Sequence, residues 1–114
     1  MIYFQDDNFI LDFKWIDDFS KQYRDIIGLP FHCHIRIDSI SQEVIRLLKR
    51  AGCYSISFAI ETGNKELRYE ILRRKISTEK ILSVAKMLHD ANIHFRIFNM
   101  LGIPGGTFNN DLET

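Results

Sequence analysis

In Tyr54-Ser-Ile-Ser-Phe-Ala-Ile-Glu-Thr-Gly-Asn64, large apolar residues alternate with small or polar ones. The apolar positions are Ile56, Phe58 and Ile60. A period of two predicts a β-strand with one apolar face and one face of small residues. The strand ends at Glu61, and a helical pattern begins after Gly63. A carboxylate at the C-terminal end of a strand, beside a Gly-Asn turn, is typical of the active-site rim of a parallel α/β protein.

The rest of the chain alternates between strand and helix patterns. Strands are predicted at residues 2–5, 31–37 and 94–100, and helices at 13–27, 42–51, 65–74, 78–91 and 109–114. The expected N-caps are Asp12, Ser41, Asn64 and either Ser77 or Thr78, and the expected helix stops are Gly28 and Gly52. Because strands joined through helices run parallel with right-handed crossovers, this order predicts an α/β fold.

The composition narrows the class of protein. The chain has 114 residues, of which 46% are hydrophobic and 26% charged, and its formal net charge is zero. This length allows one domain but not an eight-stranded barrel, and the balanced charge gives no basic footprint for nucleic acid. No segment has the length of a membrane span and no secretory signal opens the chain. We therefore expect a cytoplasmic protein that binds a small molecule.

The two cysteines, Cys33 and Cys53, fit no Cys-x-x-Cys spacing. Both lie in or beside apolar strand patterns, which favours buried reduced thiols over a disulfide or a reactive thiol. His32 and His34 beside Cys33 suggest zinc. Alternation along a strand points Cys33 to the opposite face, however, and this disfavours a metal site.

Polar groups follow each of the four predicted strands. They are Asp6 and Asp7 after the first, His34, Arg36 and Asp38 at the end of the second, Glu61, Gly63 and Asn64 after the third, and Asn99 with the turn Gly102–Thr107 after the fourth. In a parallel α/β sheet, ligands bind at the C-terminal ends of the strands. We therefore expect these groups to share one polar pocket.

Each group also has a simpler interpretation. Asp6-Asp7 could bind a divalent metal or form a helix-initiating turn. Glu61 could be a general base, a ligand for ribose hydroxyls or a cap. The turn at residues 102–107 resembles a phosphate cradle, but it lacks the Lys and Ser/Thr of a P-loop. We interpret the basic cluster at residues 68–75 (Arg68, Arg73, Arg74 and Lys75) as a solvated helix face; an arginine that reaches a substrate carboxylate is the alternative.

Six short motifs, taken together in this order, resemble the radical S-adenosylmethionine (radical SAM) enzymes. They are Phe4-Gln-Asp-Asp-Asn-Phe9, Arg36-Ile-Asp38, Leu48-Lys-Arg-Ala-Gly-Cys53, Ile60-Glu-Thr-Gly-Asn64, Ile71-Leu-Arg-Arg-Lys-Ile-Ser-Thr-Glu79 and Phe98-Asn-Met-Leu-Gly-Ile-Pro-Gly-Gly-Thr107. The resemblance covers essentially the whole chain and is closest to the branch often preceded by a cobalamin-binding domain. It implies part of a TIM-like (β/α)6 barrel, about strands 2 to 5, with S-adenosylmethionine held at the C-terminal rim.

The resemblance also implies roles for single residues. Asp6 and Asp7 fall near a motif that contacts the methionine amino group, Glu61 falls on a carboxylate that bonds the ribose, and Arg74 matches an arginine that pairs with the methionine carboxylate. Further cofactor-binding residues are expected at Asn64, Asn99, Gly102, Pro104 and Gly105, with the glycine-rich turn beside the adenine. His34 and Arg36 are expected to touch substrate if they face the barrel interior.

The sequence departs from the family in one important respect. It lacks the Cys-x-x-x-Cys-x-x-Cys loop that holds the family's 4Fe-4S cluster, and Cys33 and Cys53 cannot replace it. Three thiolates are needed because the fourth iron position stays open for the cofactor. Gly106 also stands where the family often carries an acidic residue.

We therefore expect residues 1–114 to be a fragment of a radical SAM core domain that is inert alone. The parent protein would hold the cluster, with cobalamin as an optional cofactor, and the expected partner is the missing N-terminal part of the barrel. The alternatives are a small non-catalytic α/β module that binds a nucleotide or adenosyl ligand, and a structural or interaction remnant with no ligand.

Overall fold

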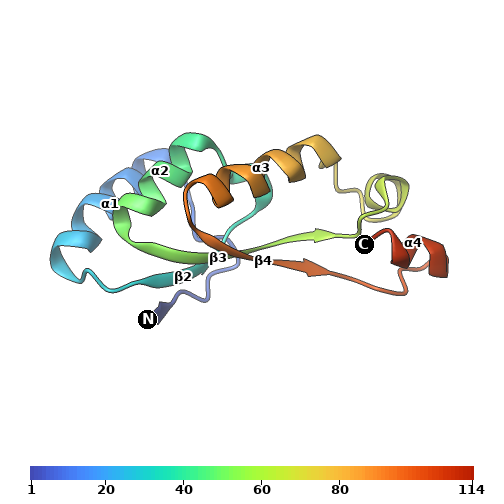
Figure 1. Cartoon of the computed structure of the whole chain (residues 1–114), viewed down its shortest axis with the longest axis horizontal. Helices are drawn as coiled ribbons and strands as arrows, with labels where there is room; N and C mark the ends of the chain where they lie inside the picture. Colours follow the sequence, from blue (N-terminus) through green and yellow to red (C-terminus); the bar gives the residue numbers. More distant parts are fainter.

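The computed structural model describes all 114 residues and contains one sheet of four parallel strands. The strands are β1 (Ile2–Tyr3), β2 (Phe31–His34), β3 (Cys53–Glu61) and β4 (His94–Asn99), and they lie side by side in this order (Figure 1). At least one helix connects each strand to the next. The predicted α/β fold, with parallel strands and crossover helices, is confirmed.

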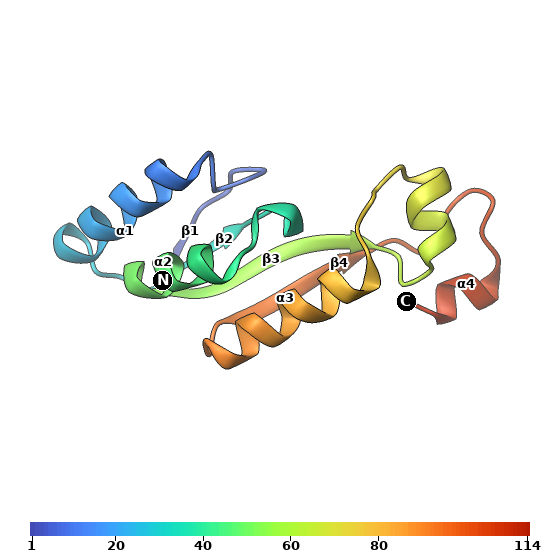
Figure 2. The same ribbon diagram turned by 90° about the horizontal axis from the view of Figure 1, so that it is seen from above.

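Three longer helices cover one face of the sheet (Figures 1 and 2). They are α1 (Phe13–Ile26), α2 (Gln42–Ala51) and α3 (Thr78–Asp90), and a short helix, α4 (Phe108–Leu112), follows β4. Asp12, Ser41 and Ser77 cap the longer helices, because each side chain accepts a hydrogen bond from the backbone N–H three residues on. These caps match the predicted ones. None of the helices has the length and apolar composition needed to cross a membrane.

The core lies between these helices and the sheet. The apolar positions of β3 point into it, and none is more than 8% exposed. Around the fully buried ring of Phe31, four aromatic rings lie at centroid distances of 5.1 to 5.7 Å, which joins α1 to β2. Cys33 and Cys53 are both buried and unpaired. The neighbouring Cys53 thiol and burial raise the pKa of Cys33, so its thiol stays protonated at neutral pH.

No helix covers the opposite face of the sheet, which we call the open face (Figure 1). Strand register aligns small, polar and aromatic residues there in three rows: Tyr3, His32, Ser55 and His94; His34, Ser57 and Arg96; Ala59 and Phe98. Nδ1 of His32 lies 2.8 Å from the Ser55 hydroxyl oxygen, and Nε2 lies 3.2 Å from the Ser57 hydroxyl oxygen. Both ring nitrogens of this buried histidine therefore have partners.

Three elements differ from the predicted ones. β1 ends at Tyr3 and β2 at His34, because loop bonds replace the ladder there: the N–H of Phe9 donates to the His34 carbonyl at 2.8 Å. After β2 the chain turns into a 3-10 helix, η1 (Ile37–Ser39). The segment predicted as an α-helix at 65–74 forms instead a five-residue π-helix, η2 (Leu67–Ile71).

The solvated helix face predicted at residues 68–75 is wrong for Arg68, whose side chain is fully buried. Its guanidinium donates to the backbone carbonyls of Ile76 at 2.8 Å and Thr62 at 2.6 Å, and to the Thr78 hydroxyl at 3.1 Å. The side chain thus joins η2 to the end of β3 and to the start of α3. No carboxylate takes part, so backbone carbonyls and a hydroxyl solvate this cation.

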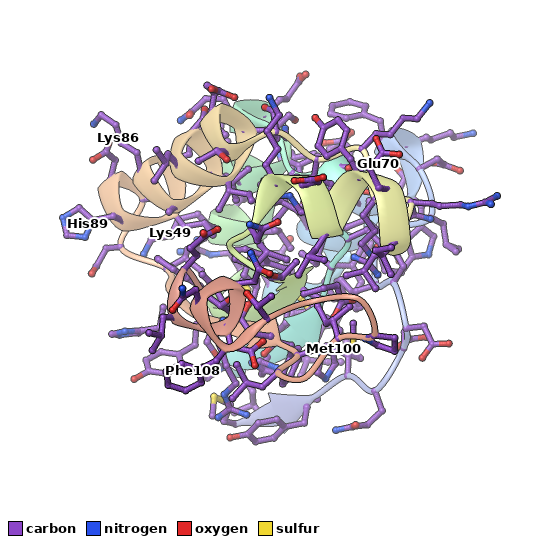
Figure 3. The ribbon with its side chains drawn as sticks, turned by 90° about the vertical axis from the view of Figure 1, so that its right-hand side faces the viewer. Lys49, Glu70, Lys86, His89, Met100 and Phe108 are labelled. Atoms are coloured by element: carbon purple, nitrogen blue, oxygen red, sulfur yellow. The ribbon has the colours of Figure 1, made fainter.

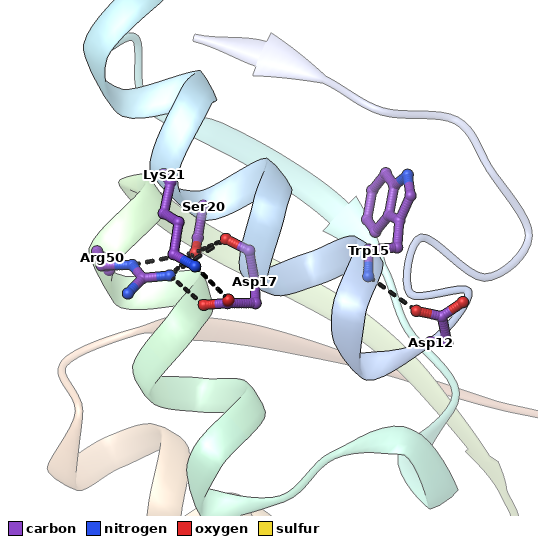
Figure 4. Close-up of polar contacts among 6 residues, drawn as sticks. All are labelled: Asp12, Trp15, Asp17, Ser20, Lys21 and Arg50. Atoms are coloured by element: carbon purple, nitrogen blue, oxygen red, sulfur yellow. Dashed lines mark hydrogen bonds and ion pairs between the residues drawn. The ribbon is translucent and has the colours of Figure 1, made fainter.

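A polar cluster on the outer side of the helical layer joins α1 to α2 (Figure 4). The Asp17 carboxylate accepts hydrogen bonds from Lys21 at 2.5 Å and from Arg50 at 2.7 Å, and Arg50 also contacts the Ser20 hydroxyl. These bonds hold the pKa of Asp17 below its usual value.

Asp17→Asn is expected to destabilise the protein at neutral pH and to have no effect in strong acid. A carboxyl whose folded-state pKa is lowered stabilises the fold above its unfolded-state pKa, and this contribution is lost as the pH falls through the folded-state pKa. Urea unfolding of wild type and variant, measured from pH 7 down to about pH 2, should give converging free energies. Asp18→Asn, at the exposed neighbour without an ion pair, is the control. A difference for Asp17→Asn that stays constant with pH would contradict this account.

Candidate functional site

A cavity of about 140 Å³ lies at the C-terminal ends of the strands. Asp7, His34, Arg36 and Arg74 contribute to its wall, together with Phe98. These residues come from three strand ends and from the segment after η2, far apart in the sequence. The structure thus brings together three of the residues predicted for one polar pocket, Asp7, His34 and Arg36, with Arg74, which the family resemblance predicted as a cofactor-binding residue.

Glu61 ends β3 with an unusual backbone conformation. Its φ of 70° is uncommon for a residue with a Cβ. The register between β3 and β4 also shifts between Ala59 and Glu61, as at a β-bulge, which re-aims a side chain. Oε1 of Glu61 lies 3.0 Å from Nη2 of Arg74, and the Glu61 side chain is only 17% exposed. Backbone strain of this kind clusters at functional sites, which supports a binding role for Glu61.

Arg74 reaches Glu61 because of the segment that follows the π-helix. Leu72 follows η2, and the next residue, Arg73, is in the left-handed region with φ of 51°. Beside Arg74 lies a second cavity of about 580 Å³. Its charged lining residues are Asp7, Arg36, Asp38, Arg73, Arg74 and Lys75. The Arg36–Asp38 ion pair, at 3.1 Å, offsets part of this charge. The cavity keeps a net positive lining, which suits an anionic ligand group.

Asn64 lies just beyond the C-terminal end of β3 and lines neither cavity. Its Oδ1 accepts a hydrogen bond from the N–H of Leu67 at 2.9 Å, so the predicted cap is present. Its Nδ2 donates to the Glu113 carboxylate at 2.6 Å. Both polar ends of the side chain are therefore occupied within the protein.

The turn that contains Gly102, Pro104 and Gly105 lies at the same end, next to η2 and α4, as Figure 3 shows from that side. The N–H of Gly102 donates to the Asp111 carboxylate of α4 at 3.1 Å. Met100 before the turn and Phe108 after it are 41% and 75% exposed. The turn is accessible, but the structure does not bring it to the cavity that contains Arg74.

Asp6 and Asn99 are exposed and line neither of the two cavities. Asp6 precedes Asp7 in the loop after β1, and Asn99 is the last residue of β4, in register with Glu61. No group of three His, Cys, Asp or Glu side chains is arranged to hold a metal ion. Among the residues predicted to bind the cofactor, Asp7, Glu61 and Arg74 therefore form the best-defined group.

Ser57, Arg96 and Phe98 were not predicted as site residues. All three lie on the open face beside His34, whose ring stacks on that of Phe98 with the centroids 6.0 Å apart. The signal was present in the alternation of the fourth strand, which places His94, Arg96 and Phe98 on one face.

These features define a parallel α/β domain with a charged rim, and comparison with known proteins gives its class. The profile of the Radical SAM superfamily matches residues 7–114, so the chain belongs to that superfamily. Membership implies S-adenosylmethionine binding and, in the parent enzymes, a 4Fe-4S cluster.

The chain is also similar to cytidylyl-2-hydroxyethylphosphonate methyltransferase of Streptomyces wedmorensis. The two are 24% identical over 102 residues, which are 88% of this chain and 19% of the methyltransferase. The chain thus spans about a fifth of the length of this relative. The predicted family is confirmed, and the cobalamin-associated branch stays a prediction.

Proposed function

We propose that this chain binds S-adenosylmethionine at the C-terminal rim of its sheet, as part of the (β/α)6 barrel of a larger radical SAM enzyme. The observation that carries the proposal is the Glu61–Arg74 pair, at 3.0 Å, on a bulged and strained strand end. Arg74 lines the cavity at the strand ends, and the ion pair places the Glu61 carboxylate, an acceptor that does not itself line that cavity, beside the guanidinium donors.

Each member of the pair has capacity left for a ligand. Oε1 of Glu61 faces Arg74, and no hydrogen bond within the chain involves Oε2. Oε2 is therefore available to accept hydrogen bonds from the ribose hydroxyls. The Arg74 side chain is 43% exposed, and a guanidinium has five N–H donors, so it can also bind the methionine carboxylate. Asp7, across the cavity, would accept from the methionine ammonium group.

The barrel is proposed from the uncovered parts of the fold. α1, α2 and α3 all cover one face of the sheet, as helices do around a barrel, and the open face would line the interior (Figure 1). β1 and β4 are edge strands with unpaired backbone groups. Neighbouring strands of a longer protein would satisfy those groups.

The residues of this chain do not fit an iron–sulfur cluster. The sequence has two cysteines, and both lie in the core under the helices. We propose that another segment of the whole protein binds the cluster, which when bound supplies the electron for sulfonium cleavage. The chain alone would then hold S-adenosylmethionine without cleaving it. The reduced buried thiols agree with a cytoplasmic location.

The substrate class is proposed from the relative. Its name describes a methyl transfer to a molecule that carries a phosphonate group. We extend the same substrate class, an organic molecule with a phosphonate group, to the protein that contains this chain.

Glu61→Ala is expected to weaken S-adenosylmethionine binding by about tenfold or more, because the ribose hydroxyls lose a charged acceptor. Isothermal titration of the 114-residue chain measures this directly and needs no cluster. Glu70→Ala, at an exposed carboxylate on η2 (Figure 3), is the matched control and should bind like wild type. Equal affinities for wild type and Glu61→Ala would remove Glu61 from the site, and no binding by wild type would refute the proposal.

A further inference from the structure

The middle row of the open face holds two side chains suited to an anion. His34, Ser57 and Arg96 are neighbours in register on β2, β3 and β4. Adjacent strands lie about 4.8 Å apart, so His34 and Arg96 flank Ser57 from its two sides. A ligand group placed over Ser57 is therefore within reach of both long side chains.

The three rows of the open face carry positive charge and no carboxylate. None of the residues in these rows is Asp or Glu. Arg96 is exposed and has no ion pair or side-chain hydrogen bond within the chain. Burial, with the nearby His34 and Arg96, lowers the pKa of His32, which agrees with a positive field at this face. At the end of the face, Glu61 is already paired with Arg74, and Asp7 lines the strand-end cavity together with His34 and Arg74.

The shape of the face suits an organic ligand rather than a bare ion. Arg96 lines a cavity of about 240 Å³ together with Tyr3, His32 and His94. On its other side, Phe98 is 42% exposed and lines the cavity at the strand ends. An apolar or aromatic surface thus adjoins the cation.

We propose that the open face binds the phosphonate group of the organic substrate, with Arg96 and His34 as the binding side chains. This inference rests on the proposed function and deepens it. An arginine fork and a second donor from another direction match the several oxygens of a tetrahedral phosphonate better than the two oxygens of a carboxylate. Phe98 would pack against the organic part of the molecule. Arg96 and His34 are then specificity-determining residues of the whole enzyme.

The test is a calorimetric titration of the 114-residue chain with phenylphosphonate at fixed ionic strength. Arg96→Gln should weaken binding by about tenfold or more, since a charged hydrogen-bond donor is lost. Arg46→Gln, which removes an equal charge from an exposed position of α2, should change the affinity less than about twofold. Equal losses in the two variants, or no loss in Arg96→Gln, would overturn the proposal.

Two comparison ligands test the chemical class. Benzoate keeps the ring and carries a carboxylate, and it should bind at least about fivefold more weakly than phenylphosphonate. Inorganic phosphate lacks the ring and should also bind more weakly; equal or tighter binding of either ligand would overturn the assignment to an organic phosphonate.

S-adenosylmethionine affinity is measured in the same variants, and Arg96→Gln should leave it unchanged. Failure of cofactor binding in wild type would refute the proposed function, whereas failure of phenylphosphonate discrimination alone would refute only this inference.

Discussion

Arg68→Met is expected to lower the free energy of unfolding by about 3 kcal/mol. Arg68 is fully buried, and its guanidinium donates hydrogen bonds to the Thr62 and Ile76 carbonyls and to the Thr78 hydroxyl. Methionine fills a similar space but cannot donate, so these acceptors stay buried without partners. Each unsatisfied buried acceptor costs roughly 1–3 kcal/mol, and removing the buried charge recovers part of that loss.

Urea unfolding followed by circular dichroism measures the change, with Arg46→Met on the exposed side of α2 as the control. The control should stay within about 0.5 kcal/mol of wild type. Arg68→Lys retains the charge with fewer donors and a different geometry, and it should fall between wild type and Arg68→Met. Stability of Arg68→Met equal to that of wild type would mean that burying the guanidinium costs as much as its hydrogen bonds contribute.

Local patterns were sufficient to predict most of the fold. Alternation in β3 and the caps at Asp12, Ser41 and Ser77 depend on neighbours a few residues away, and the structure confirms them. The π-helix at Leu67–Ile71 could not be predicted in this way. Its α-helical pattern is sound, but Arg68 turns inward to backbone carbonyls of Thr62 and Ile76. That contact depends on how three segments pack, which no sequence period encodes.

The candidate site was also predictable only in part. Parallel topology alone places Asp7, His34 and Arg36 at one edge of the sheet, and the structure shows them around one cavity. The left-handed conformation of Glu61 and its pairing with Arg74 arise from a bulge and from the turn after η2. Neither has a local signature.

Gly63→Ala is expected to displace the C-terminal residues from the end of β3. A Cβ at Gly63 would overlap the carbonyl oxygen of Glu113 and lie 2.9 Å from Cα of Thr114. Those atoms belong to backbone, so no side-chain rotation relieves the overlap. Separation would break the bond from the Gly63 N–H to the Thr114 hydroxyl, at 3.0 Å, and the bond between Asn64 and Glu113, at 2.6 Å. Together with the overlap, this should lower the free energy of unfolding by about 3 kcal/mol.

Hydrogen exchange locates the effect of Gly63→Ala within the fold. The amide of Gly102 should lose protection along with α4, because its partner Asp111 lies on that helix. Shortening the chain to end at Leu112 removes the atoms that the added Cβ would meet, which provides a double-mutant cycle. In the shortened chain, Gly63→Ala should have almost no further effect on stability. If the substitution destabilises the shortened chain as much as the full one, then the strain lies in the Gly63 backbone and not in its contact with the residues after α4.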